Sequence, residues 1–207
     1  MRIAYPSLRL LILELISKAA RAGRKPALHP NGFVQLNLDG AGDIRLHVWS
    51  PRALPMPQQK TKHPIHDHNF DMHSTILRGC LRNYLYRAVP MERYGPPAYQ
   101  LYRAIQISGT SDTVLHKIDS GKYHRLEITS TNDYELGESY DMSKGVLHQA
   151  VPHGLTATLV TKAQADASYR PIVAVPDGVQ PDNDYRRTAA TPESVQILWR
   201  LIGRAIE

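Results

Sequence analysis

Residues 63–79 read HPIHDHNFDMHSTILRG, a stretch that places four histidines within eleven positions. His66 and His68 stand two residues apart, so on a β-strand both imidazole rings project from the same face. Two imidazoles on one face can reach the same metal ion without unusual backbone geometry. An isolated pair of this kind is more often two ordinary polar residues in a loop, so the metal-site hypothesis needs a third ligand elsewhere.

A third histidine closes a second notable stretch, residues 137–148, which reads GESYDMSKGVLH. Its glycines and small polar residues indicate a turn, and the apolar residues next to His148 indicate the start of a strand. The sequence therefore offers His66, His68 and His148 as candidate ligands of one metal ion.

Together the two stretches resemble the paired motifs of the cupin superfamily. In the first motif a His-x-His pair precedes an acidic residue and a glycine, and in the second, spaced glycines precede a histidine. Six residues keep the expected spacing: His66, His68, Gly79, Gly137, Gly145 and His148. Four positions depart from the motifs: Lys60, Met72, Ser143 and Pro152. The resemblance implies a jelly-roll β barrel over residues 30–165, with the metal inside it.

Met72 occupies the place of the acidic ligand, which leaves a set of three neutral imidazoles. This set resembles the thiol dioxygenase branch of the cupins, to which cysteine dioxygenase belongs. The resemblance implies a mononuclear non-haem Fe(II) centre that binds a small organic substrate, such as a thiol, and O2 at its open positions. Neutral ligands leave the ion its full positive charge, which favours an anionic thiolate as its partner.

Three features of that branch are missing. Its Ser-His-Tyr relay would fall in residues 155–161, which read LTATLVT and contain neither His nor Tyr. Gln35 takes the place of its carboxylate-binding Arg, and Cys80 does not lie where a cysteine–tyrosine crosslink would form. Cysteine is therefore not the expected substrate. Proton transfer is assigned instead to three other catalytic candidates: His73, Tyr86 and His153.

The candidate substrate-binding residues are Gln35, Arg82 and Tyr84. Tyr84 and Tyr86 alternate along one expected strand, so they share a face and could line the cavity, with packing in the core as the alternative. Arg82 shares that face and could pair with an acidic group of the substrate, or could be solvated.

His73 and His153 each have two interpretations. A one-residue shift in the loop would make His73 a fourth ligand in the place of Met72, and otherwise it faces outward or contacts a substrate. His153 follows a proline and suits the rim of the site better than the metal. Asp67, between two ligands, is expected to point away from the metal and to orient a neighbouring loop.

Alternating apolar and polar residues indicate β structure in the middle of the chain. Residues 33–38 and 44–48 flank the sequence DGAGD, which predicts a hairpin. Further short strands are expected at residues 75–77, 81–87, 99–107, 114–118, 123–129, 146–151 and 155–161, separated by turn signals such as 78–79 and 131–133. This spacing favours a sandwich or barrel over a parallel sheet.

The two ends of the chain indicate amphipathic helices. Leu8, Leu11 and Leu15 share one face, and near the C-terminus the N-cap candidate Thr191 precedes an apolar stripe over residues 195–202. These stripes need either the barrel or a second subunit as a cover, so a homodimer is one of two expectations. The expected parts are a helical arm at 1–29, a cupin barrel at 30–165 and an extension ending in a helix at 166–207.

The composition sets limits on partners and location. The net charge is +6, but Lys and Arg are scattered instead of forming a stripe with aromatic residues, so nucleic acid is not expected as a partner. No apolar run approaches the ~20 residues that cross a bilayer. The first segment suits an amphipathic helix better than a signal peptide. The single cysteine cannot form an internal disulfide and fits a reducing cytoplasm.

Two functions are compatible with these features. The first is an Fe(II) oxygenase acting on a small organic molecule that coordinates the metal directly, although another first-row divalent metal could take the place of iron. The second is a metal-binding cupin without redox chemistry, namely an isomerase, a hydrolase or a ligand-sensing module. The three-histidine set favours the first function, and the missing relay favours the second.

Overall fold

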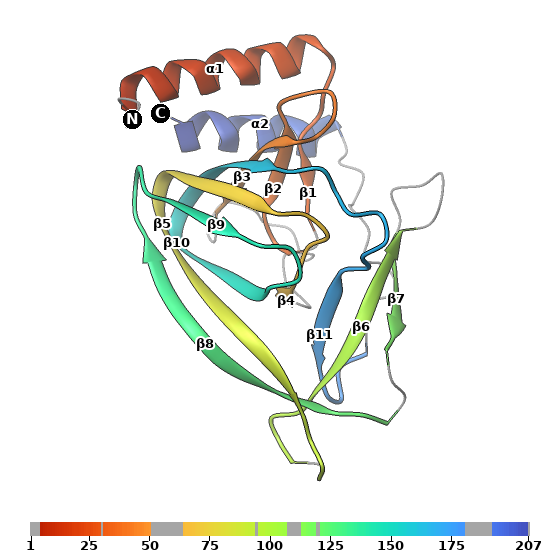
Figure 1. Ribbon diagram of the computed structural model, residues 1–207. Coiled ribbons are helices and arrows are strands. Elements are labelled where there is room, and N and C mark those ends of the chain that lie inside the picture. The colour runs from red at the N-terminus through yellow and green to blue at the C-terminus, as the bar shows by residue number, and fades with distance from the viewer. Residues whose placement is uncertain are drawn as a thin grey trace.

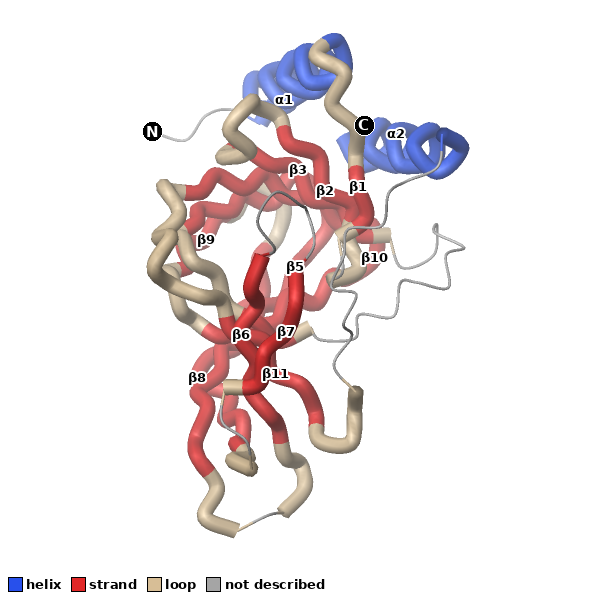
Figure 2. Tube along the Cα trace, turned by 90° about the vertical axis from the view of Figure 1, so that its right-hand side faces the viewer, coloured by secondary structure: helices blue, strands red, loops and turns tan. Residues whose placement is uncertain are grey.

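The computed structural model describes residues 5–29, 31–50, 64–93, 95–106, 113–118, 121–180 and 192–206. In this part of the chain the fold is mainly β, with one helix near each end (Figures 1 and 2). Eleven strands form one antiparallel sheet in the order β1-β2-β3-β10-β4-β11-β6-β8-β5-β9. Strand β7 lies off this path beside β6, and β10 also pairs with β5.

The elements have the following bounds: α1 (Tyr5–Arg21), β1 (Ala27–Leu28), β2 (Val34–Asn37), β3 (Ile44–Trp49), β4 (Ile65–His66), β5 (Met72–Pro90), β6 (Tyr99–Gln106), β7 (Thr113–Lys117), β8 (His124–Tyr134), β9 (Ser139–Met142), β10 (Leu147–Lys162), β11 (Ile172–Pro176) and α2 (Pro192–Ile206). The predicted mainly β chain with helical ends is confirmed. Thr191, the expected N-cap, lies outside the described residues.

The predicted hairpin is confirmed as β2 and β3, which pair from Val34 with Val48 to Asn37 with Arg45. Asp39 closes the connection, because its Oδ1 accepts a hydrogen bond from the Ile44 amide at 3.2 Å. Alternate residues of the two strands are apolar and fully buried on one face of the sheet. Because successive side chains of a strand point to opposite faces, these apolar residues lie on one face of the sheet and the residues between them lie on the other face.

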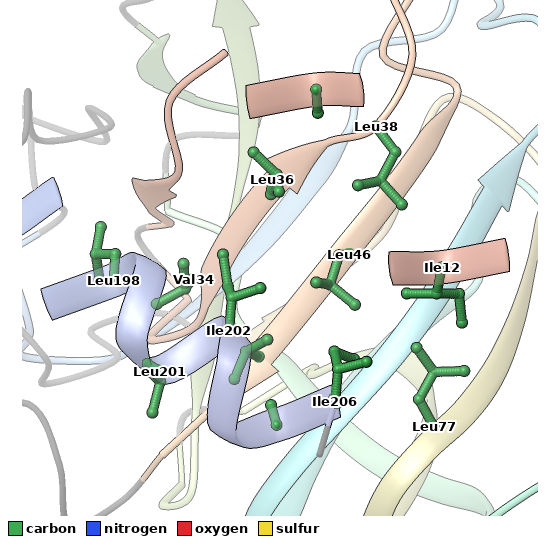
Figure 3. Packing of buried hydrophobic residues seen from close by; sticks show 14 residues of the cluster. Ile12, Val34, Leu36, Leu38, Leu46, Leu77, Leu198, Leu201, Ile202 and Ile206 are labelled. Carbon is green, nitrogen blue, oxygen red and sulfur yellow. The ribbon is translucent and has the colours of Figure 1, made fainter. Parts of the chain in front are cut away.

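Both helices cover that apolar face (Figure 1). In Figure 3, Leu198 and Ile202 of α2 lie beside Val34, and Ile12 of α1 lies close to Leu77. Full burial of one such side chain contributes about 1.5–3 kcal/mol, so this layer is a main source of stability. The predicted amphipathic helices thus cover the sheet, but the predicted stripe of α1 is wrong at Leu11, which is 47% exposed, whereas Ile12 and Ala19 are fully buried. Neither described helix combines the length and apolarity needed to cross a membrane.

Two long strands replace the short ones expected from the sequence. Strand β5 continues through the expected turn at 78–79, and β10 joins the strands expected at 146–151 and 155–161. The two strands pair along most of their length, with a register shift between His153 and Ala157. Gly79 lies beside this irregularity with φ of 73°, and a Cβ there would come within 2.5 Å of the Leu155 carbonyl oxygen. Glycine at 79 therefore permits a bulge inside a continuous strand pair and not a turn.

The sheet also extends beyond the expected barrel limits. Strand β11 falls in the region assigned to the C-terminal extension, yet it pairs with both β4 and β6. Strand β1 falls in the expected helical arm and pairs with β2. Residues 131–133, expected as a turn, belong to β8 and pair with β5. Short apolar runs such as IVAVP carry no clear periodicity, which explains why β11 was not predicted.

Candidate metal centre

Two neighbouring strands bring three histidines to one place. His66 ends β4, His68 follows two residues later, and His148 is the second residue of β10. His66 and His148 are direct partners in the antiparallel pairing of β4 with β10, so their side chains project from the same face. One ring nitrogen from each of the three residues lies within 4.8 Å of the other two. The three predicted ligands therefore converge as a group that could hold one metal ion.

Backbone carbonyls fix the orientation of two of these rings. The Nδ1 atom of His66 lies 3.1 Å from the carbonyl oxygen of Pro64, and Nδ1 of His148 lies 3.0 Å from that of Val146. A carbonyl can only accept, so each Nδ1 carries the proton and each Nε2 keeps its lone pair. Metal-binding histidines are commonly oriented in this way. Asn31 Nδ2 lies 3.1 Å from Nε2 of His66, so a bound ion would compete with this amide for that lone pair.

Burial keeps the three imidazoles neutral. Loss of water lowers the pKa of His66, and burial with the neighbouring His148 and His66 lowers the pKa of His68 well below its usual value. Burial and the nearby His66 lower the pKa of His148 to about 3. A neutral imidazole is the form that binds a metal, so these ligands need not lose a proton first at neutral pH.

Asp67 lies between two of the histidines and holds them in place. Its side chain is 2% exposed and accepts hydrogen bonds from the Tyr169 hydroxyl at 2.5 Å and from the Ile172 amide at 2.6 Å. The backbone of Asp67 also donates to the Ile172 carbonyl at 3.0 Å. Asp67 therefore ties the His-x-His segment to the start of β11, and it orients a neighbouring loop as predicted. Burial raises the pKa of this carboxyl, and its two hydrogen bonds oppose the rise.

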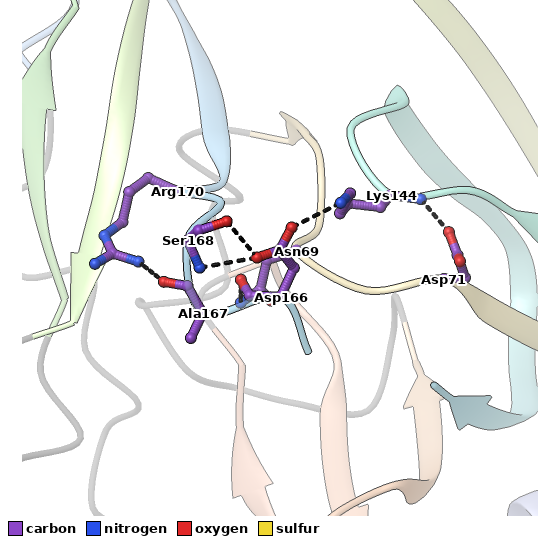
Figure 4. Close-up of polar contacts among 7 residues, drawn as sticks. All are labelled: Asn69, Asp71, Lys144, Asp166, Ala167, Ser168 and Arg170. Atoms are coloured by element: carbon purple, nitrogen blue, oxygen red, sulfur yellow. Dashed lines mark hydrogen bonds and ion pairs between the residues drawn. The ribbon is translucent and has the colours of Figure 1, made fainter. Parts of the chain in front are cut away.

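A polar network joins the loops around the site (Figure 4). Asp166 lies at its centre, because its carboxylate accepts from Lys144 Nζ at 2.7 Å and from the Ser168 amide at 2.8 Å. The Asp166 carbonyl also accepts a hydrogen bond from Asn69. The Lys144 amide donates to Asp71 Oδ1 at 2.7 Å. These contacts connect the loop after His68, the turn before His148 and the segment that leads into β11.

A cavity of about 600 Å³ opens beside the histidines, and His66 and His68 form part of its wall. Its aromatic and apolar lining includes Phe33, Phe70 and Val173. The ring of Phe70 stacks on His68 with centroids 4.8 Å apart. The volume lies within the usual 300–1,000 Å³ of small-molecule sites. A metal held by the three histidines would therefore face a space large enough for an organic ligand.

The predicted substrate-binding residues separate into two groups. Gln35 is 4% exposed and lines the cavity. Arg82 and Tyr84 lie on the opposite face of β5, where Arg82 forms a two-pronged ion pair with Asp133 at 2.7 Å. Tyr84 pairs with Gln149 of β10, which alternates with His148 and so faces away from it. Arg82 and Tyr84 therefore do not line the site.

None of the three predicted proton-transfer residues faces the cavity. Tyr86 is paired with Leu147, which faces away from the neighbouring His148, and its hydroxyl donates to Gln149. His153 is exposed and is paired with Cys80 on the outer face. His73 is half exposed and bonds Asp141 at 2.8 Å. The alternation of side chains along a strand explains all three placements. Each residue lies an odd number of positions from an inward-facing residue of the same strand, so it faces outward.

Met72 lines the cavity, whereas the adjacent His73 projects to the outer surface. A fourth histidine ligand is therefore not provided by β5. Met72 stands at the position that is acidic in the cupin motif, and its thioether faces the cavity.

Several residues of the cavity wall were not predicted from the sequence. Arg45, His47, Phe33, Phe70 and Arg170 all line it. The alternation in β3 could have identified two of them, because Arg45 and His47 occupy every second position between apolar residues. Arg170 could not have been found in this way, because it reaches the cavity from an irregular segment next to β11.

Comparison with known proteins adds no relative: no protein-family model matches the chain, and no curated protein matches it.

Proposed function

We propose that the chain forms a cupin jelly-roll barrel and acts as a mononuclear non-haem Fe(II) oxygenase on a small organic substrate. The order of strand pairing supports the barrel. Starting from β10, the pairings run through β4, β11, β6, β8 and β5 and return to β10. A sheet closes on itself when its pairing order returns to the starting strand.

The observation that carries the oxygenase proposal is the composition of the ligand set. Within the described residues, the cluster consists of three imidazoles, of which His148 is buried and the other two are half-buried, and it includes no carboxylate. Three protein ligands on one side leave coordination positions for substrate and O2, and iron in such a site supplies redox chemistry at the point where the two meet. His66, His68 and His148 would hold the ion.

The surrounding residues have positioning roles in this proposal. The carbonyls of Pro64 and Val146 select the tautomer that presents Nε2. Asp67 and Tyr169 hold the His-x-His segment against β11. The apolar part of the cavity wall excludes water from the space where a substrate would lie, which strengthens electrostatic interactions there.

The test is oxygen consumption by protein reconstituted with Fe(II). Candidate thiols, carboxylic acids and amines would be added one by one under anaerobic conditions, followed by a measured amount of O2. We expect consumption with at least one class, and none with His148→Ala under the same conditions. No consumption with any compound, together with full occupancy by zinc in protein purified without chelators, would contradict the proposal.

One observation favours the alternative, a metal-binding cupin without redox chemistry. His73, Tyr86 and His153, the residues expected to move protons, all face away from the cavity. An oxygenase would then depend on its substrate or on water for proton transfer. Native zinc and an absence of oxygen chemistry would support a hydrolase, an isomerase or a ligand-sensing module.

A further inference from the structure

The two helices form one outer layer of the molecule, the helical layer (residues 5–25 and 192–206), and it carries most of the net charge. Both helices lie over the apolar face of β2 and β3 (Figures 1 and 2). The helical layer holds seven basic and two acidic residues, so the rest of the chain keeps 18 of the 25 basic and 17 of the 19 acidic residues. Charges nearly balance in the rest of the chain, and most of the excess positive charge therefore lies on the helical layer.

Most of these cations are exposed, and one of them joins the helices. Lys18, Arg21 and Lys25 are exposed in α1 and the turn after it, and Arg200 is exposed in α2. Arg9 donates from Nε to the Ile206 carbonyl at 2.8 Å. This hydrogen bond connects the first half of α1 to the end of α2, so the two helices present their charges as one joined layer.

Large apolar side chains are exposed on the same layer. Leu10 is 69% exposed, Leu11 47% and Leu13 39%, and these three residues lie within about one turn of α1. In α2, Ile197 is 38% exposed. Among the leucines, Ile12 is fully buried against the sheet. Packing on the sheet therefore accounts for one side of α1 and leaves other apolar side chains in water, which is typical of a surface that a membrane or a protein covers.

The charge of the helical layer distinguishes between the partners that could cover it. A two-fold dimer would place the same surface of both subunits in contact, so the cations of one layer would face those of the other. Like charges brought together in this way oppose association. Nucleic acid would neutralise the cations, but its phosphates and sugars would leave the leucines without an apolar partner. An anionic membrane suits both features, because apolar side chains enter the boundary between headgroups and acyl chains while Lys and Arg meet the lipid charges.

We infer that the helical layer docks on an anionic membrane surface, with α1 lying in the plane of the membrane and Leu10, Leu11 and Leu13 inserted among the lipid headgroups. Docking in this plane needs no helix that crosses the bilayer. The cavity lies on the opposite face of β2 and β3 from the helices, so the membrane does not cover it. This contact goes beyond the proposed function and does not depend on the metal.

Co-sedimentation of the full chain with sucrose-loaded vesicles tests this contact. One set of vesicles holds equimolar phosphatidylserine and phosphatidylcholine, and the other set holds phosphatidylcholine alone. We expect at least ~10-fold tighter binding to the anionic set, because each Lys or Arg near an anionic surface contributes about a factor of five.

Two double variants separate the apolar contribution from the charged one. Leu10→Gln with Leu13→Gln should weaken binding to the anionic vesicles by ~10-fold or more, because the inserted apolar surface is lost. Lys18→Gln with Arg21→Gln should also weaken it by ~10-fold or more and should reduce the preference for phosphatidylserine. Circular dichroism would check the fold of each variant. Leu10→Gln alone, at the most exposed of the three leucines, replaces the double variant if that one does not fold.

The controls change the same kinds of side chain far from the helices. Ile128 is 58% exposed on β8, and Lys117 is exposed on β7 (Figure 1). Ile128→Gln and Lys117→Gln should bind both sets of vesicles as the wild-type protein does.

Equal binding to the two sets of vesicles, binding to neither, or unchanged binding in either folded double variant would overturn the inference. A dimer that forms without vesicles and is dispersed by the leucine substitutions, as seen by light scattering, would assign the face to a second copy of the chain. Binding of double-stranded DNA that blocks the vesicles and survives the leucine substitutions would assign it to nucleic acid. Either result would also overturn the inference.

Discussion

Replacing Tyr169 by Phe removes one hydroxyl and tests whether Asp67 holds the metal-binding segment in place. The hydroxyl donates to Asp67 Oδ2 at 2.5 Å, and Asp67 is 2% exposed. The other carboxylate oxygen keeps its hydrogen bond from the Ile172 amide. The variant therefore leaves one oxygen of a buried carboxylate without its donor, while the aromatic ring is retained.

The expected loss of stability follows from this geometry. A hydrogen bond to a charged group contributes about 1.5–3 kcal/mol, and the orphaned oxygen cannot be rehydrated easily in a buried position. We expect Tyr169→Phe to lower the free energy of unfolding by about 2 kcal/mol at pH 7.5. For a chain of 207 residues this corresponds to a fall in Tm of about 4–8 °C. The loss should be smaller at pH 4, because a protonated Asp67 depends less on the donor.

The sign of this pH effect follows from the pKa of Asp67. Burial raises that pKa, and the Tyr169 hydrogen bond lowers it by favouring the ionised form. Removing the bond raises the pKa of Asp67 further. The variant therefore loses most stability at pH values above the pKa of Asp67, where the carboxylate is ionised, and least at pH values below it. Urea unfolding at pH 7.5 and pH 4 would measure both values. Tyr134→Phe is the control, because within the described chain its ring stacks on Tyr140 and its hydroxyl makes no hydrogen bond. Equal losses in the two variants, or a larger loss at pH 4, would refute the reasoning.

Three further predictions concern other parts of the molecule. Gly79→Ala should cost at least ~2 kcal/mol of unfolding free energy, because its Cβ would lie 2.5 Å from the Leu155 carbonyl oxygen; Gly121→Ala, with an open environment and a similar φ, should cost only ~1 kcal/mol. Since the pKa of His148 in the folded protein is about 3, below the value of 6.5 in the unfolded chain, metal-free protein should lose stability as the pH falls below about 6.5. Urea unfolding at pH 7.5 and pH 5.5 should show a smaller loss of stability between the two pH values in His148→Ala than in the wild-type protein. Leu36→Ala should destabilise by about 2–5 kcal/mol in thermal or urea unfolding, because its side chain is fully buried under the helices, and a loss below 1 kcal/mol would contradict this packing.

Local patterns predicted the parts of the fold that depend on neighbours in sequence. The β2–β3 hairpin could be predicted because its alternation and its Gly/Asp connection are both local signals. Strand β11 could not, because its pairing with β4 and β6 depends on residues that lie far away in the sequence, such as His66 for Val173 and Arg103 for Ile172. The continuity of β5 through Gly79 was missed for a related reason. A glycine with positive φ serves equally in a turn and in a bulge, and only the partner strand decides between them.

The candidate site was also predicted only in part from the sequence. The spacing of His66 and His68, combined with the stretch before His148, was sufficient to predict that these side chains meet. The sequence could not show which face of β5 points inward, and so Arg82, Tyr84 and Tyr86 were expected in a cavity from which they face away. A shift of one residue in a strand's register moves every side chain to the other face. Whether a residue of β5 lies on the same face as His148 depends on how β5 pairs with β10, and that pairing belongs to the three-dimensional structure.

Metal stoichiometry and ligation provide the most direct test of the central claim that three histidines form one metal centre. Protein loaded with Fe(II) under anaerobic conditions would be analysed for bound iron, and X-ray absorption would give the distances of the coordinating atoms. The account predicts one iron per chain, with imidazole nitrogens at ~2.0–2.2 Å and loss of the ion in His148→Ala. Iron that binds equally well to His148→Ala, or a wild-type protein that binds none, would contradict it.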